Sequence, residues 1–285
     1  MNYTKKQILG SYLAGLWEGD GHITIAKAGG KPAFHISFNI KDSAVAKKLL
    51  NYIMHKCNSN AGSIRYQKKK NTCVLNIYSI EGLKYLICLV NGRLRTPKAY
   101  QIGVIIDWLN STHNTNIYKL PMANTGLWKD AWLAGFIDAD GSFGIELLGQ
   151  RKQVVCKFRL AQRMMHVTSA YYIHNERNLS YKRIMSCIAN YLYVKLNVRK
   201  KARSNKTYYI VSMSSTRSKK ILRDYLDKYC LLTSKFLDYK DWCAVDDLML
   251  TKSHYTKQGQ QNISKLKSSM NNLRTYYNWD HLDLF

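Results

Sequence analysis

Hydrophobic positions along the chain change twice from a helical spacing to an alternating one. The helical spacing is carried by Ile8, Leu9, Tyr12, Leu13 and Leu16 in the first stretch, and by Leu127, Ala131, Trp132 and Phe136 in the second. Each helix is followed by an alternating segment, residues 22–26 and 142–148 respectively, which predicts a strand. The chain therefore reads as two similar halves, each beginning with a helix and a strand.

The rest of each half follows the same order. In the first half the pattern predicts strands at 34–41, 63–67 and 73–78, and helices at 43–54, 80–90 and 97–109. In the second half it predicts strands at 154–160, 195–203 and 207–214, and helices at 181–193, 216–228 and 233–249. Each half is thus predicted as αββαββα, an α+β fold in which helices cover one face of a four-stranded antiparallel sheet and leave the other face free.

A polar stretch in the middle of the chain indicates the linker between the two halves. Residues 111–125 are polar and are predicted to link an N-terminal half, 1–110, to a C-terminal half, 126–285. Residues 164–179 have no counterpart in the first half and are predicted to be an inserted loop, and residues 262–275 are predicted to form an extra helix. The length of 285 residues is compatible with two domains of ordinary size.

The strongest motif spans the end of each first helix. Leu-Ala-Gly-Leu-Trp-Glu-Gly-Asp-Gly at 13–21 and Leu-Ala-Gly-Phe-Ile-Asp-Ala-Asp-Gly at 133–141 share one pattern, 120 residues apart. The final glycine predicts the helix stop. Small residues four apart lie on one helical face and allow a second helix backbone to approach closely; they are Gly15, Gly19, Gly135 and Ala139. We therefore expect the two motif helices to pack together.

Acidic residues at these helix ends are unfavourable unless something compensates for them. A carboxylate in the last turn of a helix costs about 0.3–1 kcal/mol, and packing of the two helices would bring Asp20 and Asp140 together as like charges. A divalent cation would resolve this conflict, because hard cations bind carboxylate and carbonyl oxygens. The alternative, exposed acids on a C-terminal turn, is reasonable for one copy, but the repetition favours a cation site.

Charge sets the class of partner. The chain carries 44 basic against 18 acidic residues, a net charge of +26, which indicates nucleic acid or an anionic membrane surface. The sequence contains neither a membrane-spanning apolar run nor a secretion signal, and its seven cysteines have no zinc spacing. Abundant Lys, Tyr, Asn and Ile suggest an A/T-rich genome such as that of an organelle, although codon drift without functional meaning explains them equally well.

The free sheet face offers side chains that can bind DNA. In the first half they are Thr24, Ser37, Asn39, Lys41, Ser63, Arg65, Gln67, Asn76 and Tyr78, and in the second Glu146, Lys157, Arg159, Asn197, Arg199, Lys201, Ser212 and Ser214. Such groups hydrogen-bond base edges, and a β-ribbon fits the major groove. An ordinary solvated sheet face is the alternative. A similar basic, amide-rich face in both halves favours DNA.

The two motifs resemble those of the LAGLIDADG homing endonucleases, in the monomeric two-motif form encoded by organellar introns. Segments 91–98 and 231–239 are similar to those that place a lysine by the active site of that family. The resemblance implies a DNA-binding saddle with the motif helices at its centre. It also implies Mg²⁺ bound by Asp20, Asp140 and the carbonyls of Gly19 and Ala139, with Lys98, Lys235 and Gln162 as further catalytic residues. Asp42 stands where the first half would carry the counterpart of Gln162.

The function expected from this resemblance is site-specific cleavage of double-stranded DNA. Metal-assisted hydrolysis of one phosphodiester per strand across the minor groove would leave short 3′ overhangs. The target would be long and near-palindromic but asymmetric, because the halves differ. The enzyme would act as a monomer in an organelle, with a fungal-type mitochondrion as the expected compartment. The alternative is a non-catalytic nucleic-acid binder, such as a splicing maturase acting on its host intron RNA.

Overall fold

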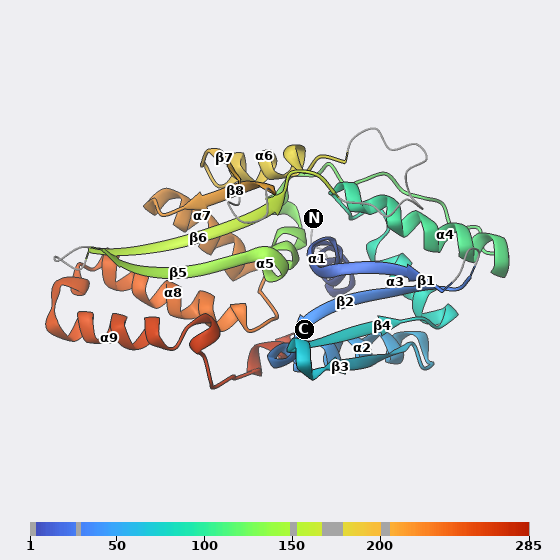
Figure 1. Cartoon of the computed structure of the whole chain (residues 1–285), viewed down its shortest axis with the longest axis horizontal. Helices are drawn as coiled ribbons and strands as arrows, with labels where there is room; N and C mark the ends of the chain where they lie inside the picture. The colour runs from blue at the N-terminus through green and yellow to red at the C-terminus, as the bar shows by residue number, and fades with distance from the viewer. Residues whose placement is uncertain (1–3, 27–29, 149–152, 167–178, 201–205, 285) are drawn as a thin grey trace. The chain divides into compact units, whose positions relative to one another are not determined.

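The computed structural model describes residues 4–26, 30–148, 153–166, 179–200 and 206–284, and the chain forms two compact units (Figure 1). Unit 1 contains residues 1–139 and 164–184, and unit 2 contains residues 140–163 and 185–285. Among the described residues, no helix combines the length and apolar character needed to cross a membrane.

Unit 1 contains the first half of the predicted pattern. Its helices are α1 (Lys5–Asp20), α2 (Ser43–Cys57), α3 (Ile80–Val90), α4 (Tyr100–His113) and α5 (Trp132–Asp140, of which the last residue belongs to unit 2), with short 3₁₀ turns η1 (Ile40–Asp42), η2 (Lys68–Lys70), η3 (Pro97–Ala99) and η4 (Leu127–Lys129). Its strands are β1 (Gly21–Ile25), β2 (Pro32–Asn39), β3 (Gly62–Gln67) and β4 (Thr72–Ile77). Thr4 caps α1 by accepting a hydrogen bond from the backbone N–H of Gln7, which fixes the start of the first motif helix.

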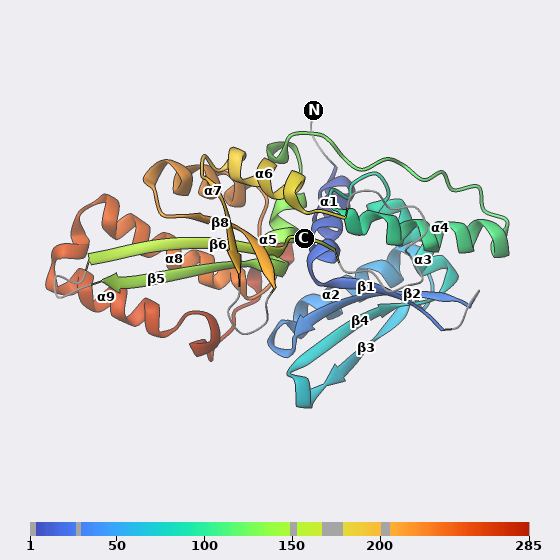
Figure 2. The ribbon, with the colours of Figure 1, turned by 45° about the horizontal axis from the view of Figure 1, so that its top comes forward.

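The strands of unit 1 form one antiparallel sheet in the order β1-β2-β4-β3. Helix α2 lies along one side of this sheet (Figure 2) and contacts β3 and β4. The covered face carries Phe34, Ile36 and Leu75, each at most 1% exposed. Burial of each such side chain contributes about 1.5–3 kcal/mol, so alternation of the strand residues leaves the polar set on the opposite face.

Unit 2 contains the second half apart from residues 126–139 and 164–184, which belong to unit 1. Its strands are β5 (Gly141–Leu148), β6 (Gln153–Arg163), β7 (Leu196–Lys200) and β8 (Thr207–Met213), paired antiparallel in the order β5-β6-β8-β7. Its helices are α6 (Lys182–Tyr191, beginning in unit 1), α7 (Thr216–Lys228), α8 (Lys235–Leu250) and α9 (Lys257–Ser268), with 3₁₀ turns η6 (Ser253–Tyr255), η7 (Asn271–Leu273) and η8 (Asp280–Leu284). Helix α8 contacts β5 and β6, where Trp242 packs edge-on against Phe143 at 5.7 Å.

The predicted α+β class and the order αββαββα are confirmed in both halves. Several boundaries were wrong. Helix α4 extends to His113, so residues 111–113 of the expected linker are helical. The expected helix at 262–275 begins earlier, because Thr256 caps α9 at Gly259, and it ends at Ser268. Met165, in the expected inserted loop at 164–179, pairs with Ser180 just after that loop. Residues 167–178 lie outside the described residues.

The predicted close approach of the motif helices is confirmed within unit 1. A Cβ atom on Gly15 of α1 would lie 1.9 Å from the carbonyl oxygen of Trp132 on α5. A Cβ atom on Gly135 would lie 1.9 Å from the carbonyl oxygen of Tyr12 on α1. Each helix therefore uses its motif glycine where the backbone of the other passes, and no larger residue fits either position.

Candidate functional site

The first motif helix ends at the residue predicted to bind metal. Asp20 is the last residue of α1 and is exposed, and Gly19 before it is partly buried. The helix stops at the final glycine as predicted, and the structure shows why glycine is required there. Gly21 is extended, with φ −93°, and a Cβ atom there would lie 2.0 Å from the Trp17 ring. The aromatic side chain in the preceding turn therefore requires glycine.

Lys98 is anchored at this helix end. The Thr96 hydroxyl accepts a hydrogen bond from the Lys98 backbone N–H, which fixes the short turn η3. The Lys98 Nζ donates to the carbonyl oxygens of Trp17, Glu18 and Gly19 at 2.9, 3.2 and 3.3 Å. It also lies 5.0 Å from the centre of the Trp17 ring, and the residue is only 6% exposed. An ammonium group at a helix C-terminus is stabilised by the partial negative charge of the carbonyls.

Lys235 occupies a related local position in unit 2. It is the first residue of α8, and its backbone N–H donates to the Thr233 hydroxyl at 3.2 Å. The corresponding bond from Lys98 to Thr96 has the same length. Lys235 is partly buried. The two lysines therefore share one local arrangement, a threonine two residues earlier that orients the lysine backbone.

The first acid of each motif binds the other motif helix instead of facing solvent. The Glu18 carboxylate is 1% exposed and accepts bonds from the backbone N–H groups of Arg95 and Thr96 and from the Trp132 indole at 2.6 Å. Burial raises the pKa of Glu18 to about 7, although these donors act in the opposite direction. Asp138 accepts a 2.5 Å bond from the Tyr12 hydroxyl. Both acids therefore hold the two motif helices together.

The remaining predicted catalytic and metal residues lie at element ends. Asp140 ends α5, and both it and Ala139 are partly buried. Gln162 lies near the end of β6 opposite Tyr209, on the sheet face that also carries buried Leu160. Asp42, in the corresponding place of the first half, is 6% exposed and lies in η1 beside the start of α2.

The motif ends provide oxygen ligands of the kind that a hard cation requires. Each motif helix ends in one aspartate. The backbone carbonyls of its last turn accept no hydrogen bond from within the helix, because the helix provides no further N–H groups. The carbonyl of Gly19 already accepts a bond from the cationic Lys98 Nζ, which shows that this helix end attracts positive charge. The donor set of carboxylate and carbonyl oxygens therefore fits a divalent cation such as Mg²⁺.

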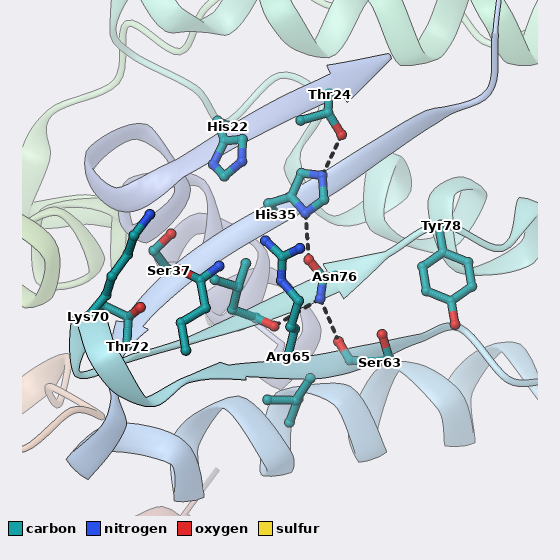
Figure 3. Close-up of a pocket in the computed structure, with 13 residues that line it drawn as sticks. His22, Thr24, His35, Ser37, Ser63, Arg65, Lys70, Thr72, Asn76 and Tyr78 are labelled. Atoms are coloured by element: carbon teal, nitrogen blue, oxygen red, sulfur yellow. Dashed lines mark hydrogen bonds between the residues drawn. The ribbon is translucent and has the colours of Figure 1, made fainter. Parts of the chain in front are cut away.

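The uncovered face of the unit 1 sheet carries polar side chains around a hollow of about 890 Å³ (Figure 3). Strand pairing places most of the predicted residues on this one face, and the hollow is lined by Thr24, Ser37, Ser63, Arg65, Gln67, Asn76 and Tyr78 among others. Asn39 lies on the same face opposite Thr72. Further lining residues were not predicted as site residues; they are His22, His35, Ile64, Lys70, Thr72 and Val74. For His35 the signal was available, since it alternates with buried Phe34 and Ile36.

Two predicted residues of this face lie off the strands. Lys41 was expected on the second strand, but β2 ends at Asn39, whose side chain accepts a bond from the Lys41 backbone N–H and starts the turn η1. Its expected position on the sheet was therefore wrong. Tyr78 follows the end of β4 and still lines the hollow.

The unit 2 sheet presents a similar face. Pairing places Arg159 between Ser142 and Ser212 across three strands. Glu146, Lys157, Asn197 and Arg199 fall on the same face by strand alternation, and Ser214 follows the end of β8. The Lys157 ammonium pairs with the Glu146 carboxylate at 2.5 Å. Lys201 lies outside the described residues, as does the end of the strand expected at 195–203.

Comparison with known proteins agrees with this arrangement. The family model described as "LAGLIDADG endonuclease" matches residues 13–109 and 133–245. The chain is 31% identical over 319 residues to the intron-encoded DNA endonuclease aI3 of Saccharomyces cerevisiae, covering 99% of this chain and 73% of that protein. It is 32% identical over 143 residues, half of this chain and 20% of the relative, to the intron-encoded RNA maturase bI4 of the same yeast.

A solved structure also shares the fold. The LAGLIDADG homing endonuclease I-GzeII in complex with its DNA target matches with a TM-score of 0.66 and 20% identity, covering 93% of this chain and 99% of that chain. The chain belongs to the LAGLIDADG endonuclease family, because the family model matches both halves. It is a nuclease of the two-motif kind, and endonucleases of this family depend on a divalent cation.

Proposed function

We propose that the protein is a site-specific endonuclease that cleaves double-stranded DNA with Mg²⁺ as its cation. The observation that carries the proposal is that two motif helices, packed glycine to backbone, each end in an aspartate. One helix that ends in an aspartate could have a purely structural role. Two related ends, one for each strand of a duplex, match the requirement of double-strand cleavage.

In this proposal Asp20 and Asp140 hold the cation, assisted by the carbonyl oxygens of Gly19 and Ala139. The bound cation would supply a hydroxide nucleophile and stabilise the leaving 3′ oxygen. The buried contacts of Glu18 with Trp132 and of Asp138 with Tyr12 would keep the two helix ends in place.

Lys98, Lys235 and Gln162 are proposed as the groups around the scissile phosphates. Lys98 is already anchored on backbone carbonyls, so its charge is oriented before DNA binds. A preorganised cation stabilises negative charge that develops on the phosphoryl oxygens, at no cost of reorganisation. Lys235 would do the same for the second strand. Gln162 would position the attacking water by hydrogen bonding.

The uncovered sheet faces are proposed to read the major groove. Their arginine, asparagine, lysine and serine side chains provide donors and acceptors for base edges. The two faces differ in sequence; the second face, for example, carries the Glu146–Lys157 ion pair. We therefore expect a long target that is not a perfect palindrome, bound by a monomer. Cleavage across the minor groove would leave short 3′ overhangs.

The relatives support an organellar setting for this activity. The match to the intron-encoded yeast endonuclease covers nearly the whole chain, and the abundance of Lys, Tyr, Asn and Ile, whose codons are A/T-rich, fits a mitochondrial genome. The match to an intron-encoded RNA maturase over half of the chain supports a second candidate function, binding of the host intron RNA to promote splicing. The retention of Asp20, Asp140, Lys98 and Lys235 favours cleavage, because a pure RNA binder has no need of them.

The direct test is to incubate the purified protein with a randomised pool of long DNA duplexes and sequence the ends produced in Mg²⁺. Recovery of one asymmetric site with short 3′ overhangs, and no cut ends in EDTA, is the expected result. Blunt ends, 5′ overhangs or unchanged cleavage in EDTA would contradict the proposed mechanism. Absence of any cleavage, together with stimulated splicing of an intron RNA, would support the maturase instead.

A further inference from the structure

One row of polar side chains crosses all four strands of the unit 1 sheet. His22 on β1 pairs with His35 on β2, His35 pairs with Asn76 on β4, and Asn76 pairs with Ser63 on β3. Directly paired residues project from the same face, and Figure 3 shows the row along the floor of the hollow. Thr24 lies next to it, two residues after His22. The contacts between these side chains determine where each hydrogen atom lies.

The amide of Asn76 is oriented by two backbone carbonyls. Its Nδ2 donates to the carbonyl oxygens of Val74 at 3.0 Å and Ser63 at 3.4 Å. A flipped amide would place its oxygen against both carbonyls, so Oδ1 must face the other way, toward His35. Oδ1 lies 2.7 Å from Nδ1 of His35 and can only accept. Nδ1 of His35 therefore carries a hydrogen atom.

The second nitrogen of the His35 ring then acts as an acceptor. Nε2 lies 2.7 Å from the Thr24 hydroxyl oxygen. Burial and the charge of Arg65 lower the pKa of His35 below its ordinary value, which favours the neutral ring, and its stacked neighbour at 4.6 Å is another histidine, His22. A neutral ring with hydrogen on Nδ1 has a lone pair on Nε2. Thr24 must therefore donate its hydroxyl hydrogen to His35.

We propose that Thr24, His35 and Asn76 form a hydrogen-bonded relay that turns the exposed Thr24 hydroxyl into an acceptor toward DNA. The proposal rests on the proposed DNA-reading function of this face and names a specificity that it would have. With its hydrogen atom occupied by His35, Thr24 can accept a bond from a base but cannot donate one. His35 and Asn76 act as positioning residues, because they set the polarity of Thr24 without touching the DNA.

The chemistry of the major groove turns this polarity into a base preference. Adenine offers an amino group at N6 and cytosine at N4, whereas guanine and thymine present oxygen acceptors at O6 and O4. A threonine free to rotate could bond either kind and would not distinguish them. The relay selects adenine or cytosine at the base contacted by Thr24, with a preference of roughly tenfold for one well-formed hydrogen bond.

The tautomer can be measured on the free protein, independently of any activity. Nitrogen-15 NMR of the ring nitrogens of His35 at neutral pH should show hydrogen on Nδ1 and a lone pair on Nε2. Asn76→Ala removes the acceptor for Nδ1–H and should release the ring to populate both tautomers. Hydrogen on Nε2 in the wild-type protein would overturn the proposal, whether or not the protein cuts DNA.

The base preference is measured by cleavage in Mg²⁺ of target duplexes that carry each base pair at every position of the site. Thr24→Val should abolish the adenine or cytosine preference at one position, and Thr24→Ser should keep it. His35→Phe, which preserves the stacked ring, and Asn76→Ala should relax the same position and leave the others unchanged. Two substitutions at different elements keep the test valid if one variant does not fold, as judged by thermal melting.

Each outcome has a defined meaning. If Thr24→Val removes the preference and neither His35→Phe nor Asn76→Ala changes it, Thr24 reads the base without the relay and the proposal is overturned. If Thr24→Val leaves every position unchanged in an enzyme that otherwise discriminates, Thr24 does not read DNA and the proposal is equally overturned. If the wild-type protein cuts none of the duplexes while His35 shows the expected tautomer, the proposed endonuclease function has failed and the relay stands.

Discussion

The carboxylate of Glu18 accepts a 2.6 Å hydrogen bond from the indole Nε1–H of Trp132, which lies 114 residues later on the second motif helix. The reverse contact also exists, since Asp138 on the second helix accepts a 2.5 Å bond from the Tyr12 hydroxyl on the first. Tyr12 and Trp132 occupy equivalent positions in the repeat, as do Glu18 and Asp138. Each motif helix thus supplies an aromatic donor and an acidic acceptor to the other.

Glu18→Gln should destabilise the protein. A glutamine side chain accepts hydrogen bonds only through its amide oxygen. Its NH₂ group would therefore face one or more of the N–H donors that now bind the Glu18 carboxylate, among them the Trp132 indole. A buried donor left without an acceptor costs about 1–3 kcal/mol. Chemical denaturation would measure the loss. In a Trp132→Phe background the same substitution should cost less, because the indole donor is absent, and equal costs in both backgrounds would contradict this role of the pair.

Gly15→Ala should destabilise the protein by about 1–3 kcal/mol or more, the range for overpacking a well-packed interface. The new methyl group would lie 1.9 Å from the Trp132 carbonyl oxygen, which belongs to the backbone and cannot move aside. Gly103→Ala on α4 is a matched control, because its methyl group would meet only the flexible Lys119 side chain, at 3.5 Å. That control should be neutral or slightly stabilising. Equal thermal stability of the two variants would refute tight helix packing.

Binding to DNA should weaken steeply as salt concentration rises, because a net charge of +26 favours contacts to many phosphates. The logarithm of the binding constant should fall by about 0.9 per phosphate contact for each tenfold rise in salt. Lys70→Gln, at the edge of the hollow, should reduce that slope by about one contact. Lys220→Gln, which removes a lysine paired with Asp224 on α7, should leave the slope unchanged. A slope near zero for the wild-type protein would argue against a long interface with phosphates.

Arg65→Ala should weaken discrimination at one position of the target. Arg65 is exposed on the uncovered face of the unit 1 sheet, and arginine pairs best with guanine in the major groove. The expected cost is about 1–3 kcal/mol on the preferred sequence, and substitution of the contacted base pair should cost the variant little more. Competition binding with a panel of targets would measure both. A loss of the same size on every sequence would mean that Arg65 contacts a phosphate.

The sequence was sufficient to predict the fold class because its signals are local and occur twice. Alternating and helical spacings placed the strands and helices of both halves in the correct order. The packing of the motif helices through Gly15 and Gly135 followed from small residues on one helical face. These features depend on residues that are neighbours along the chain, or on the repetition itself.

Features that depend on distant neighbours could not be predicted. Gly21 is required by the Trp17 ring instead of by a left-handed backbone, which only the folded turn reveals. Lys41 does not lie on the sheet, because the Asn39 side chain accepts a hydrogen bond from the Lys41 backbone N–H and the chain turns there instead of continuing the strand. The relay through His35 depends on the pairing of three strands, and its Asn76 member lies about 40 residues after His35 in the chain. The sequence pattern alone does not specify the register of these strands.

The central claim, that the aspartates at the two motif ends perform cleavage, is tested most directly with Asp20→Asn and Asp140→Asn. Each substitution keeps the size of the side chain and removes the charge that would hold the cation. Each should abolish double-strand cleavage of the target in Mg²⁺ while binding of the uncut duplex persists, and Asp224→Asn on the exposed face of α7 should cut normally. Full double-strand cleavage by Asp20→Asn or Asp140→Asn, under conditions where EDTA stops the wild-type enzyme, would contradict the account.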